Sequence, residues 1–429
     1  MLETARDANR SIGEGERGDP CDDRAVGRRS DRAFEGEAPT LLVYGAGWNQ
    51  LPLIEASRRH GFRVVAIDRD ANAPGAARAD RFHCISLRDH EAIVAATRAE
   101  SIRGVVARIT DAEGLASAHT LARTRGLPTA CPALVEAATS KLALSQHARA
   151  AGLPMPPRLP PNEPPSLAAG PLLVRPDVTR RGKAGIRRVV RPEDLATALA
   201  EAAASSENGR IDVARWIEGE DVSVLVELDR GRAHRHAIWD EWVALDAAGG
   251  IRGVGCGLPS RFEADPDRID GLLARLAAAF AASRCLVVVS LRIDPAGDPF
   301  LIEIHLGLGG DGIADRLLPA AWPEWDAFAC WVRVEAGESN ELARGAARPC
   351  ALVRDGEGWR LIEAASVEAL HARVRASIPS DWERPFGLRG SAHSKTEAER
   401  EATMKAEREA AMKAATNDAT NDATKGTPK

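Results

Sequence analysis

The sequence has no paired cysteines, no long apolar run and no excess of positive charge, and each absence excludes a class of protein. Its seven cysteines stand singly, without the CxxC pairs that hold zinc, and their odd number and scatter favour a reducing compartment such as the cytoplasm. No stretch of about 18 apolar residues is present to span a membrane, and the first residues lack the apolar segment of a secretory signal. The net charge of -5 gives no broad positive field, so we expect no nucleic acid and no membrane among its partners.

The chain is too long for one hydrophobic core. It has 429 residues, whereas single cores stop growing near about 250 to 300 residues, so we expect at least two globular domains. Residues 1–38 have almost no apolar periodicity and predict a disordered leader. Residues 391–429 contain EREATMK, EREAAMK and TNDATNDAT and predict a low-complexity tail.

Short apolar runs alternate with helical patterns in residues 39–130. The expected strands are 41–44, 62–67 and 104–107, and the expected helices are 51–60, 89–100 and 112–125. Such alternation predicts a parallel sheet with right-handed crossovers. We therefore expect an α/β domain here.

Residues 131–335 predict a mixed, α+β organisation in two lobes. A helical pattern over 133–151 is followed by a proline-rich connector over 154–165. The first lobe has expected strands at 172–175, 187–190, 211–216 and 222–227 and a helix at 192–204. The second has an expected strand at 236–243, helices at 266–282 and 325–334, and a hairpin over 286–304 that turns at 294–297. Two further strands and a helix within 336–390 predict a small C-terminal module.

A glycine turn follows the first expected strand, in the sequence YGAGWNQ, and Asp68 lies about 20 residues beyond it. This is the start of a dinucleotide-binding fingerprint, in which an acid binds the ribose. Gln50 stands where the third glycine belongs, and its side chain would keep the helix from the close approach that the fingerprint needs. A structural turn, a nicotinamide dinucleotide site and a substrate pocket at the carboxyl ends of the strands all stay open.

Five segments in order resemble the ATP-grasp superfamily of ligases, which includes biotin carboxylase and carbamoyl-phosphate synthase. They are VVAIDRDANAPGAARADRFHC, SKLALSQHARAAGLPMPP, PLLVRPDVTRRGKAG, ARWIEGEDVSV and PFLIEIHLGLGGDGIADRLLPAA. One of these segments would be a weak signal, but five in the right order over about 300 residues are specific. The resemblance implies a pre-ATP-grasp domain at 39–130 and a two-lobed ATP-grasp domain at 131–335.

The resemblance implies that three cations bind the phosphates of ATP. Lys141 begins a helix after Ser140, Arg175 ends an apolar strand where the family usually has lysine, and Lys183 lies in the loop TRRGKAG. The residues alone allow plainer interpretations. Lys141 can be a solvated surface lysine, Arg175 can be paired with a neighbouring carboxylate, and the loop can be an ordinary surface loop.

The segment ARWIEGEDVSV resembles the hinge between the two lobes, where the family binds adenine mainly through main-chain groups. The resemblance places Arg215, Trp216 and Ile217 at the base and Asp221 at the ribose. The family commonly has a carboxylate where Ala214 stands here, and glutamate in place of Asp221.

The hairpin over 286–304 carries the expected metal site. A four-residue connection would set Glu303 opposite Ser290, and His305 would follow Glu303 on the same face by the period of two. The resemblance implies that Glu303 and His305 bind Mg²⁺, or Mn²⁺ because imidazole suits manganese better. The family has an acid at Ser290 and asparagine at His305, and a plain polar pair of Glu303 and His305 is the alternative.

Two functions from different classes follow from these residues. In the first, the chain is an ATP-dependent ligase that activates a carboxylate as an acyl phosphate for attack by an amine or thiol, with Arg175, Lys183 and Arg316 acting on the reacting groups. In the second, it binds nucleotide or substrate but has lost turnover, as the changes at Ser290 and His305 suggest. Small-molecule substrates are the expected partners, and the resemblance implies a possible homodimer.

Overall fold

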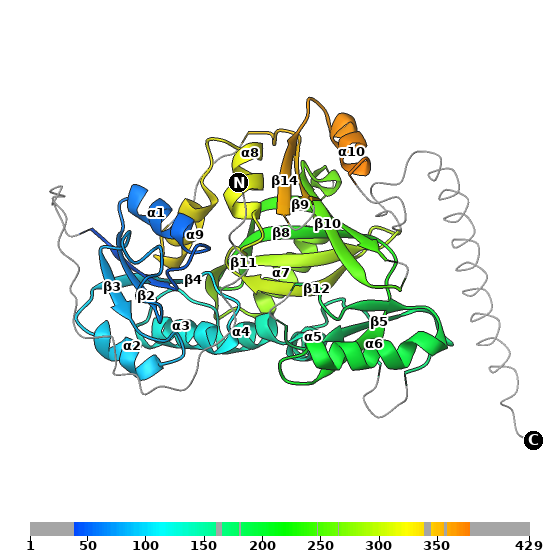
Figure 1. Cartoon of the computed structure of the whole chain (residues 1–429), viewed down its shortest axis with the longest axis horizontal. Helices are drawn as coiled ribbons and strands as arrows, with labels where there is room; N and C mark the ends of the chain where they lie inside the picture. The colour runs from blue at the N-terminus through cyan, green and yellow to red at the C-terminus, as the bar shows by residue number, and fades with distance from the viewer. Residues whose placement is uncertain are drawn as a thin grey trace, which may run out of the picture.

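The computed structural model describes residues 38–159, 165–179, 182–246, 248–264, 266–338, 345–355 and 358–377. The expected leader, except Ala38, and the expected tail lie outside these residues. In Figure 1 a small unit at the N-terminal end of the chain stands beside a large central sheet, and a second small lobe lies below that sheet. None of the described helices is long and apolar enough to cross a membrane.

The N-terminal unit is the parallel βα domain that the sequence predicts. Its strands β1 (Thr40–Tyr44), β2 (Arg63–Asp68), β3 (Arg81–Cys84) and β4 (Ile102–Ala107) pair in parallel in the order β3-β2-β1-β4. Helix α1 (Leu51–Arg59) connects β1 to β2, α2 (His90–Ala96) connects β3 to β4, and α3 (Ala112–Thr124) follows β4. Strand β3 was not predicted, because its four residues, RFHC, contain only one large apolar side chain.

The expected long helix over 133–151 is wrong, because it is two helices. Helix α4 (Pro132–Thr139) ends and α5 (Lys141–Ala150) begins at Ser140, whose backbone is extended (φ -128°, ψ 124°). The break sets Lys141 at the first position of α5. Apolar residues of both helices pack against one face of the large sheet.

The first lobe is a three-stranded sheet covered by one helix. Strands β5 (Leu172–Pro176), β6 (Arg187–Val189) and β7 (Ile211–Arg215) pair in antiparallel fashion in the order β6-β5-β7. Helix α6 (Pro192–Ser205) packs its buried alanines on this sheet.

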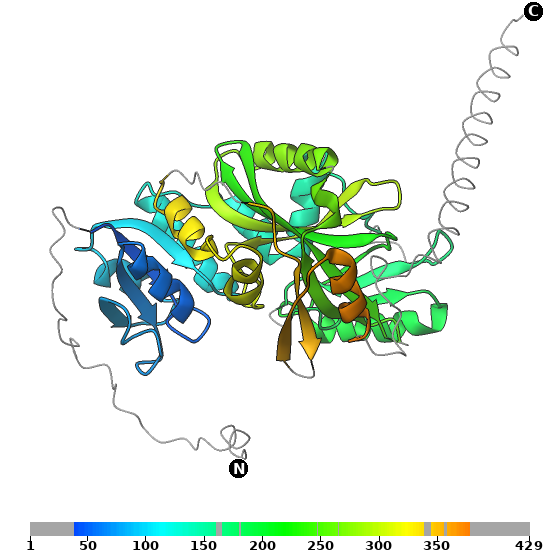
Figure 2. The ribbon, with the colours of Figure 1, turned by 90° about the horizontal axis from the view of Figure 1, so that it is seen from above.

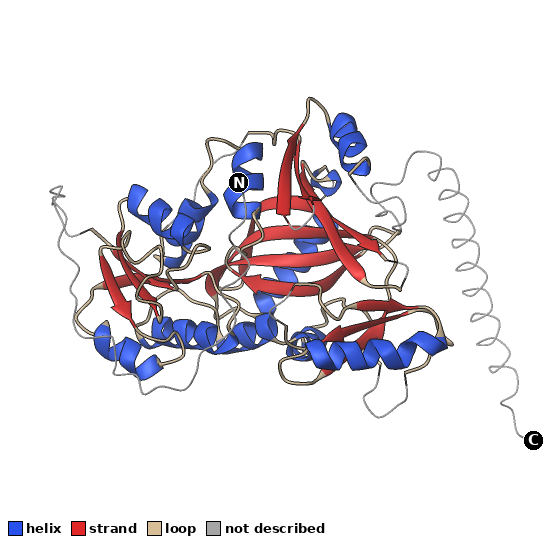
Figure 3. Cartoon of the chain, in the orientation of Figure 1, coloured by secondary structure: helices blue, strands red, loops and turns tan. Residues whose placement is uncertain are grey.

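The second lobe is a seven-stranded antiparallel sheet of order β12-β11-β8-β9-β10-β13-β14, drawn in red at the centre of Figure 3. Its strands are β8 (Glu220–Asp229), β9 (Arg232–Leu245), β10 (Ile251–Leu258), β11 (Arg284–Ile293), β12 (Pro299–Leu306), β13 (Cys350–Asp355) and β14 (Gly358–Glu363). Helix α7 (Asp267–Ala279), preceded by the short η1 (Arg261–Glu263), covers one face.

The expected C-terminal module continues this sheet. Strand β13 pairs with β10 from Leu258↔Cys350 to Gly255↔Val353, and β14 pairs with β13. Helix α10 (Val367–Arg375) packs beside them. The domain boundaries expected at 130, 335 and 390 stay predictions.

One apolar core joins the N-terminal unit to the large sheet. It contains Leu41 and Ile54 from the N-terminal unit, Trp239 from the sheet, and Phe328 and Trp331 from α9 (Ala327–Glu335). The π-helical turn η2 (Ile313–Leu317) and the short α8 (Leu318–Ala321) also contribute. Figure 2 shows α8 and α9, in yellow, between the blue unit and the green sheet.

Candidate active site

The break between α4 and α5 is held by a carboxylate from the first lobe. The Asp177 carboxylate accepts hydrogen bonds from Ser140 Oγ (2.6 Å) and from the Leu142 N–H (2.9 Å). Ser140 Oγ also accepts from the Ala143 N–H (3.1 Å), which makes Ser140 the N-cap of α5. These bonds attach the start of α5, and with it Lys141, to the end of β5.

Lys141 and Glu303 form the centre of the site. Lys141 Nζ lies 3.0 Å from Glu303 Oε1, and the Lys141 side chain is only 7% exposed. Burial acts to raise the pKa of Glu303, but the charges of Lys141, His305 and Arg175 hold it well below its usual range. The structure therefore places a carboxylate that stays ionised between two of the expected phosphate-binding cations.

Arg175 has a carboxylate partner, as its plainer interpretation allowed. Its Nε donates to Asp212 Oδ2 (2.8 Å), and Arg158 Nε donates to the other oxygen of Asp212 (2.6 Å). Asp212 is fully buried and lies directly opposite Arg175 in the β5–β7 pairing. Arg175 Nη1 also reaches the carbonyl of Ile302 on β12 (3.2 Å), so this guanidinium joins the two lobes beside Glu303.

The predicted pairing of Ser290 with Glu303 is confirmed, although the turn is different. Ile293 pairs with Pro299, so the turn is one residue longer than expected, and a bulge at Ile302 restores the register to Ser290↔Glu303. His305 Nε2 lies 3.7 Å from Glu303 Oε2, and the imidazole is half exposed.

A second carboxylate, Glu241, lies near Ser290 on the sheet and was not predicted from the sequence. Ser290 Oγ lies 3.0 Å from Ser223 Oγ, and Ser223 Oγ donates to Glu241 on β9. Oxygen atoms of Glu303, Ser290, Ser223 and Glu241 thus follow one another across β12, β11, β8 and β9. Glu241 was not found from sequence, because the strands at 222–227 and 236–243 were expected in different lobes, whereas they form the β8–β9 hairpin of one sheet.

An arginine that was not predicted fills part of the hinge. Arg292 donates to both oxygens of Asp221 (2.7 and 2.8 Å) and to the carbonyl of Ile217 (3.2 Å). Its guanidinium lies 4.3 Å from the centre of a Trp216 ring, and Trp216 Nε1 is buried without a hydrogen-bond partner in the described part of the chain. Trp216, Ile217 and Asp221 are therefore brought together, with Arg292 as their common contact.

Three of the other expected site residues have partners of their own or lie apart. Arg215 Nη1 donates to the carbonyls of Ser166 and Gly170 in the first lobe. Arg316 Nη1 donates to the carbonyl of Trp359 (2.6 Å), and no contact recorded in the described ranges joins it to Glu303. Lys183 lies over β10, with its Cε 3.8 Å from the place a Gly253 Cβ would occupy. Its loop neighbours 180 and 181 lie outside the described residues.

Side chains of the N-terminal unit fill the space beside the glycine turn of YGAGWNQ. The Asp68 carboxylate accepts from the Ala46 N–H (2.8 Å), and Gln50 Nε2 donates to the carbonyl of Arg108 (2.5 Å). A Cβ on Gly45 would lie 2.9 Å from Gln50 Cδ, so Gln50 takes the space beside the turn. These contacts agree with the structural interpretation of YGAGWNQ.

Arg108 joins this turn to the loop after β12. Its side chain is 2% exposed and donates to the carbonyls of Asn49 (2.6 Å) and Gly309 (2.6 and 3.0 Å) and to the Asp315 carboxylate. The guanidinium also lies 4.9 Å from the Phe328 ring centre. The carboxyl ends of the parallel strands and the glycine-rich loop therefore meet at one buried cation.

The described residues contain no cluster of three or more His, Cys, Asp or Glu side chains arranged to hold a metal ion. The donors near Glu303 are hard oxygens and one imidazole. The oxygens are of the kind that Mg²⁺ takes, since it commonly binds one or two protein carboxylates with water and substrate phosphates, whereas the imidazole is not.

Comparison with known proteins identifies the fold. No family model matches the chain. N5-carboxyaminoimidazole synthetase from Staphylococcus aureus, complexed with ADP, superposes with a TM-score of 0.62 at 13% identity over 80% of this chain and 98% of that one. L-amino acid ligase from Bacillus licheniformis gives 0.57 at 17% identity, over 73% and 79%. The biotin carboxylase domain of Hydrogenobacter thermophilus 2-oxoglutarate carboxylase, with MgADP and bicarbonate, gives 0.57 at 17%, over 74% of each chain.

A sequence match also exists. Formate-dependent phosphoribosylglycinamide formyltransferases from Burkholderia thailandensis and Burkholderia pseudomallei are 36% identical over 84 residues, which is 20% of this chain. That match spans about a fifth (21%) of the length of these relatives. The superpositions show that the chain has the ATP-grasp fold that the sequence predicted.

Proposed function

We propose that this chain is an ATP-dependent ligase that activates a carboxylate as an acyl phosphate, which an amine or thiol then attacks. The observation that carries the proposal is the convergence of Lys141, Arg175 and Glu303. They come from three separate elements, α5, β5 and β12, and meet where the two lobes face each other. A purely structural ion pair would need only two of them.

We propose that Lys141 and Arg175 leave their carboxylate partners and bind the phosphates of ATP. Lys141 is paired with Glu303 and Arg175 with Asp212, so neither charge is left buried and uncompensated before nucleotide binds. A triphosphate offers Arg175 a bidentate acceptor and offers Lys141 a higher negative charge than one carboxylate does. Lys183, on a loop with positive-φ glycines at 182 and 185, is proposed to close over the phosphates.

The magnesium ion of ATP is proposed to be held by Glu303, with Glu241 as a second carboxylate near Ser290. Glu303 remains ionised at any ordinary pH, because its pKa is held below the usual range. The metal would neutralise phosphate charge during transfer. His305, half exposed and beside Glu303, is proposed as an additional ligand that would favour manganese.

The chemistry needs little covalent help from the protein. A carboxylate oxygen of the substrate bonds to the γ-phosphorus while the bond to ADP breaks, and Lys141 and Arg175 stabilise the negative charge on the transferring group. The amine or thiol then attacks the acyl carbon, phosphate leaves, and a proton is lost to solvent. Exclusion of water by the closed lobes protects the acyl phosphate from hydrolysis.

The similar structures differ in the acceptors that their names give, so we propose the reaction class and leave the substrate pair open. The acceptor is proposed to lie between the Asn49 turn and the Gly309–Asp311 loop, which Arg108 holds together. Arg316, bonded to Trp359 on the far side of this loop, is proposed as an anion contact. A cytoplasmic location and a homodimer remain further proposals.

The test is release of ADP by the full-length protein from Mg-ATP, with pooled carboxylates and amines. We expect substrate-stimulated release that falls at least about 100-fold in Lys141→Gln and Glu303→Gln. Glu113→Gln, an exposed carboxylate on α3 (69% exposed), is the matched control and should leave the rate unchanged. Tight ATP binding without release from any pool would contradict turnover and favour a nucleotide-binding protein.

A further inference from the structure

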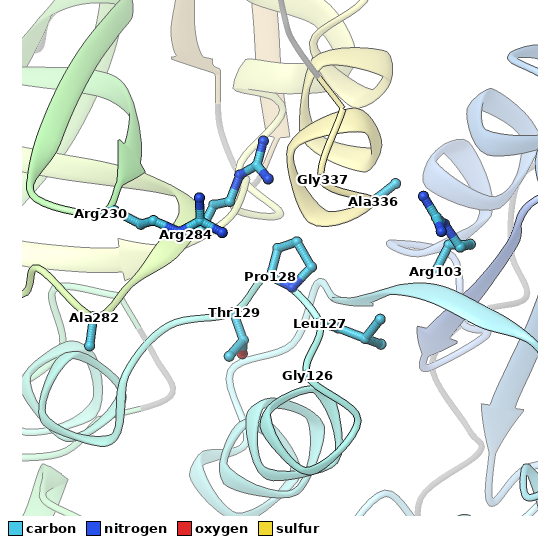
Figure 4. A pocket seen from close by; sticks show the side chains of 10 residues that line it. All are labelled: Arg103, Gly126, Leu127, Pro128, Thr129, Arg230, Ala282, Arg284, Ala336 and Gly337. Carbon is cyan, nitrogen blue, oxygen red and sulfur yellow. The ribbon is translucent and has the colours of Figure 1, made fainter.

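A cavity lies away from the Lys141–Glu303 site. Its volume is about 400 Å³, and ten residues line it (Figure 4): Arg103, Gly126, Leu127, Pro128, Thr129, Arg230, Ala282, Arg284, Ala336 and Gly337. It lies where β4, the loop after α3, the β8–β9 turn, the start of β11 and the end of α9 meet. Ser290 stands six residues further along β11 than Arg284, which is about 20 Å in a strand.

The lining of this cavity is cationic. It contains three arginines and no Asp or Glu. Arg284 Nε lies 3.4 Å from Asp229 Oδ1, but neither atom makes a hydrogen bond. No hydrogen bond or ion pair is recorded in the described ranges for the guanidinium groups of Arg103 and Arg230. Within the part of the chain that the structure describes, these two guanidinium groups therefore have no partner.

Helix ends do not account for this charge. Helices α3 and α9 both end at the cavity, at Gly126 and Gly337, and arginines near helix C-termini are stabilising. Two C-termini carry about half a negative charge each, and Asp229 adds one more. Against three guanidinium groups this leaves roughly one positive charge without compensation.

The carboxyl group of Glu335, next to the lining residue Ala336, does not supply the missing negative charge. Glu335 accepts from the Leu286 N–H (3.4 Å) and from Trp331 Nε1 (3.2 Å) and is buried. Burial raises the pKa of Glu335 to about 8, so the group is neutral at pH 7.

Arg230 has a left-handed backbone conformation, which is unfavourable for arginine. It lies in the turn between β8 and β9 with φ +48°, and it is the one non-glycine residue with positive φ in the described part of the chain. Gly or Asn adopts this conformation at lower cost. The turn is fixed by the Arg230 N–H to Ser283 carbonyl bond (2.9 Å), while the Arg284 N–H bonds the Thr129 carbonyl (2.9 Å). The fold therefore presents both guanidinium groups on fixed backbone.

We propose that this cavity binds a small molecule carrying a phosphate group, through Arg230 and Arg284, which lie side by side in Figure 4. The planar guanidinium fork matches phosphate oxygens, and a cavity of about 400 Å³ is large enough for a phosphorylated metabolite as well as for free phosphate. The proposal does not depend on the ligase function.

The test is isothermal titration of the full-length protein with inorganic phosphate and with pyrophosphate at constant ionic strength. We expect saturable binding that weakens at least tenfold in Arg230→Gln and Arg284→Gln and is unchanged in Arg354→Gln, an exposed arginine on β13. Lys141→Gln should keep this binding, which separates it from any anion bound at the nucleotide site. A free phosphate ligand and a phosphate ester are distinguished by whether glucose 6-phosphate binds more tightly than phosphate.

Arg230→Gly separates binding from folding. It relieves the positive-φ conformation, so its melting temperature should equal or exceed that of the wild type while phosphate affinity falls. Equal affinity in the wild type, Arg230→Gly and Arg284→Gln, or no saturable binding in the wild type, would overturn the proposal.

Discussion

At the scale of single residues, the site is built from charges whose partners come from cross-strand register. Arg175 faces Asp212 across β5 and β7, and Arg292 faces Asp221 across β8 and β11. The sequence predicted Arg175 and Asp221 as site residues, but it could not predict either pairing. Partners 37 and 71 residues apart become neighbours only when strand order and register are known.

The Arg292–Asp221 pair should be strongly coupled. Both side chains are nearly buried (9% and 14% exposed) and the bond is bidentate, so a double-mutant cycle with Arg292→Gln and Asp221→Asn should give a coupling free energy of about 1 to 3 kcal/mol in urea unfolding. The matched cycle is Arg268 with Asp298, exposed by 60% and 58%, which should give less than about 1 kcal/mol. Equal coupling in the two cycles would mean that burial of the hinge pair has no energetic consequence.

Glu335 should make stability depend on pH. Its pKa rises on folding from the ordinary 4.5 to about 8, so the folded chain keeps a proton that the unfolded chain releases between these values. The contribution is therefore fully present below pH 4.5 and is lost as pH rises to 8, at up to roughly 1.4 kcal/mol per pH unit.

Glu335→Gln removes this dependence, because a neutral amide can still accept from Leu286 and Trp331. Urea unfolding between pH 5 and 8 should show stability falling less with pH in this variant than in the wild type. Glu363→Gln, an exposed carboxylate on β14, should keep the wild-type slope. Parallel pH profiles for Glu335→Gln and the wild type would show that this carboxyl ionises normally in the fold.

At the scale of helices and strands, periodicity predicted most elements but not their irregular points. Strand β10 was missed because glycines at 253, 255 and 257 interrupt its apolar pattern; a Cβ on Gly257 would lie 2.3 Å from Trp242. The bulge at Ile302 was missed because it has no distinctive sequence signal. The helical pattern over 133–151 ran through Ser140, although serine is a common N-cap and the resemblance placed a helix start at Lys141. Both irregular points position the site, since one directs the Ile302 carbonyl to Arg175 and the other begins α5 at Lys141.

The Ser140 cap should matter to function as well as to stability. Ser140→Ala removes the bonds to Ala143 and Asp177 and should cost about 1 kcal/mol of unfolding free energy, with a several-fold higher KM for ATP because Lys141 loses its fixed position. Ser366→Ala is the matched control, since Ser366 caps α10 through the Ala369 N–H (3.2 Å). It should cost similar stability without changing KM, and an equal change of KM in both variants would contradict a positioning role for Ser140.

At the scale of the whole molecule, the sequence indicated the order of the parts but not how they are joined. The segment expected as a separate C-terminal module extends the large sheet through β10, and that pairing could not be seen without β10 itself. The N-terminal unit shares its core with α9 and is held to the loop after β12 by Arg108. The site is therefore completed by segments from nearly the whole described chain.

We expect Arg108 to stabilise the packing of the N-terminal unit against the loop after β12. Arg108→Met leaves Asp315 and the carbonyls of Asn49 and Gly309 without their donor, so we expect a loss of about 3 kcal/mol, near the lower end for a broken buried pair because Asp315 is 26% exposed. Arg88→Met breaks a partly exposed pair in the same unit and should cost less than about 1 kcal/mol. Losses of the same size in the two variants would contradict this role.

The central claim is that ATP binds between the lobes at Lys141, Arg175 and Glu303. Isothermal titration of the full-length protein with ATP and Mg²⁺, beside Lys141→Gln and the Glu113→Gln control, tests it most directly. The account predicts saturable, metal-dependent binding in the wild type and the control, and at least about tenfold weaker binding in Lys141→Gln. Absence of ATP binding in the wild type, or the same affinity in all three proteins, would contradict it.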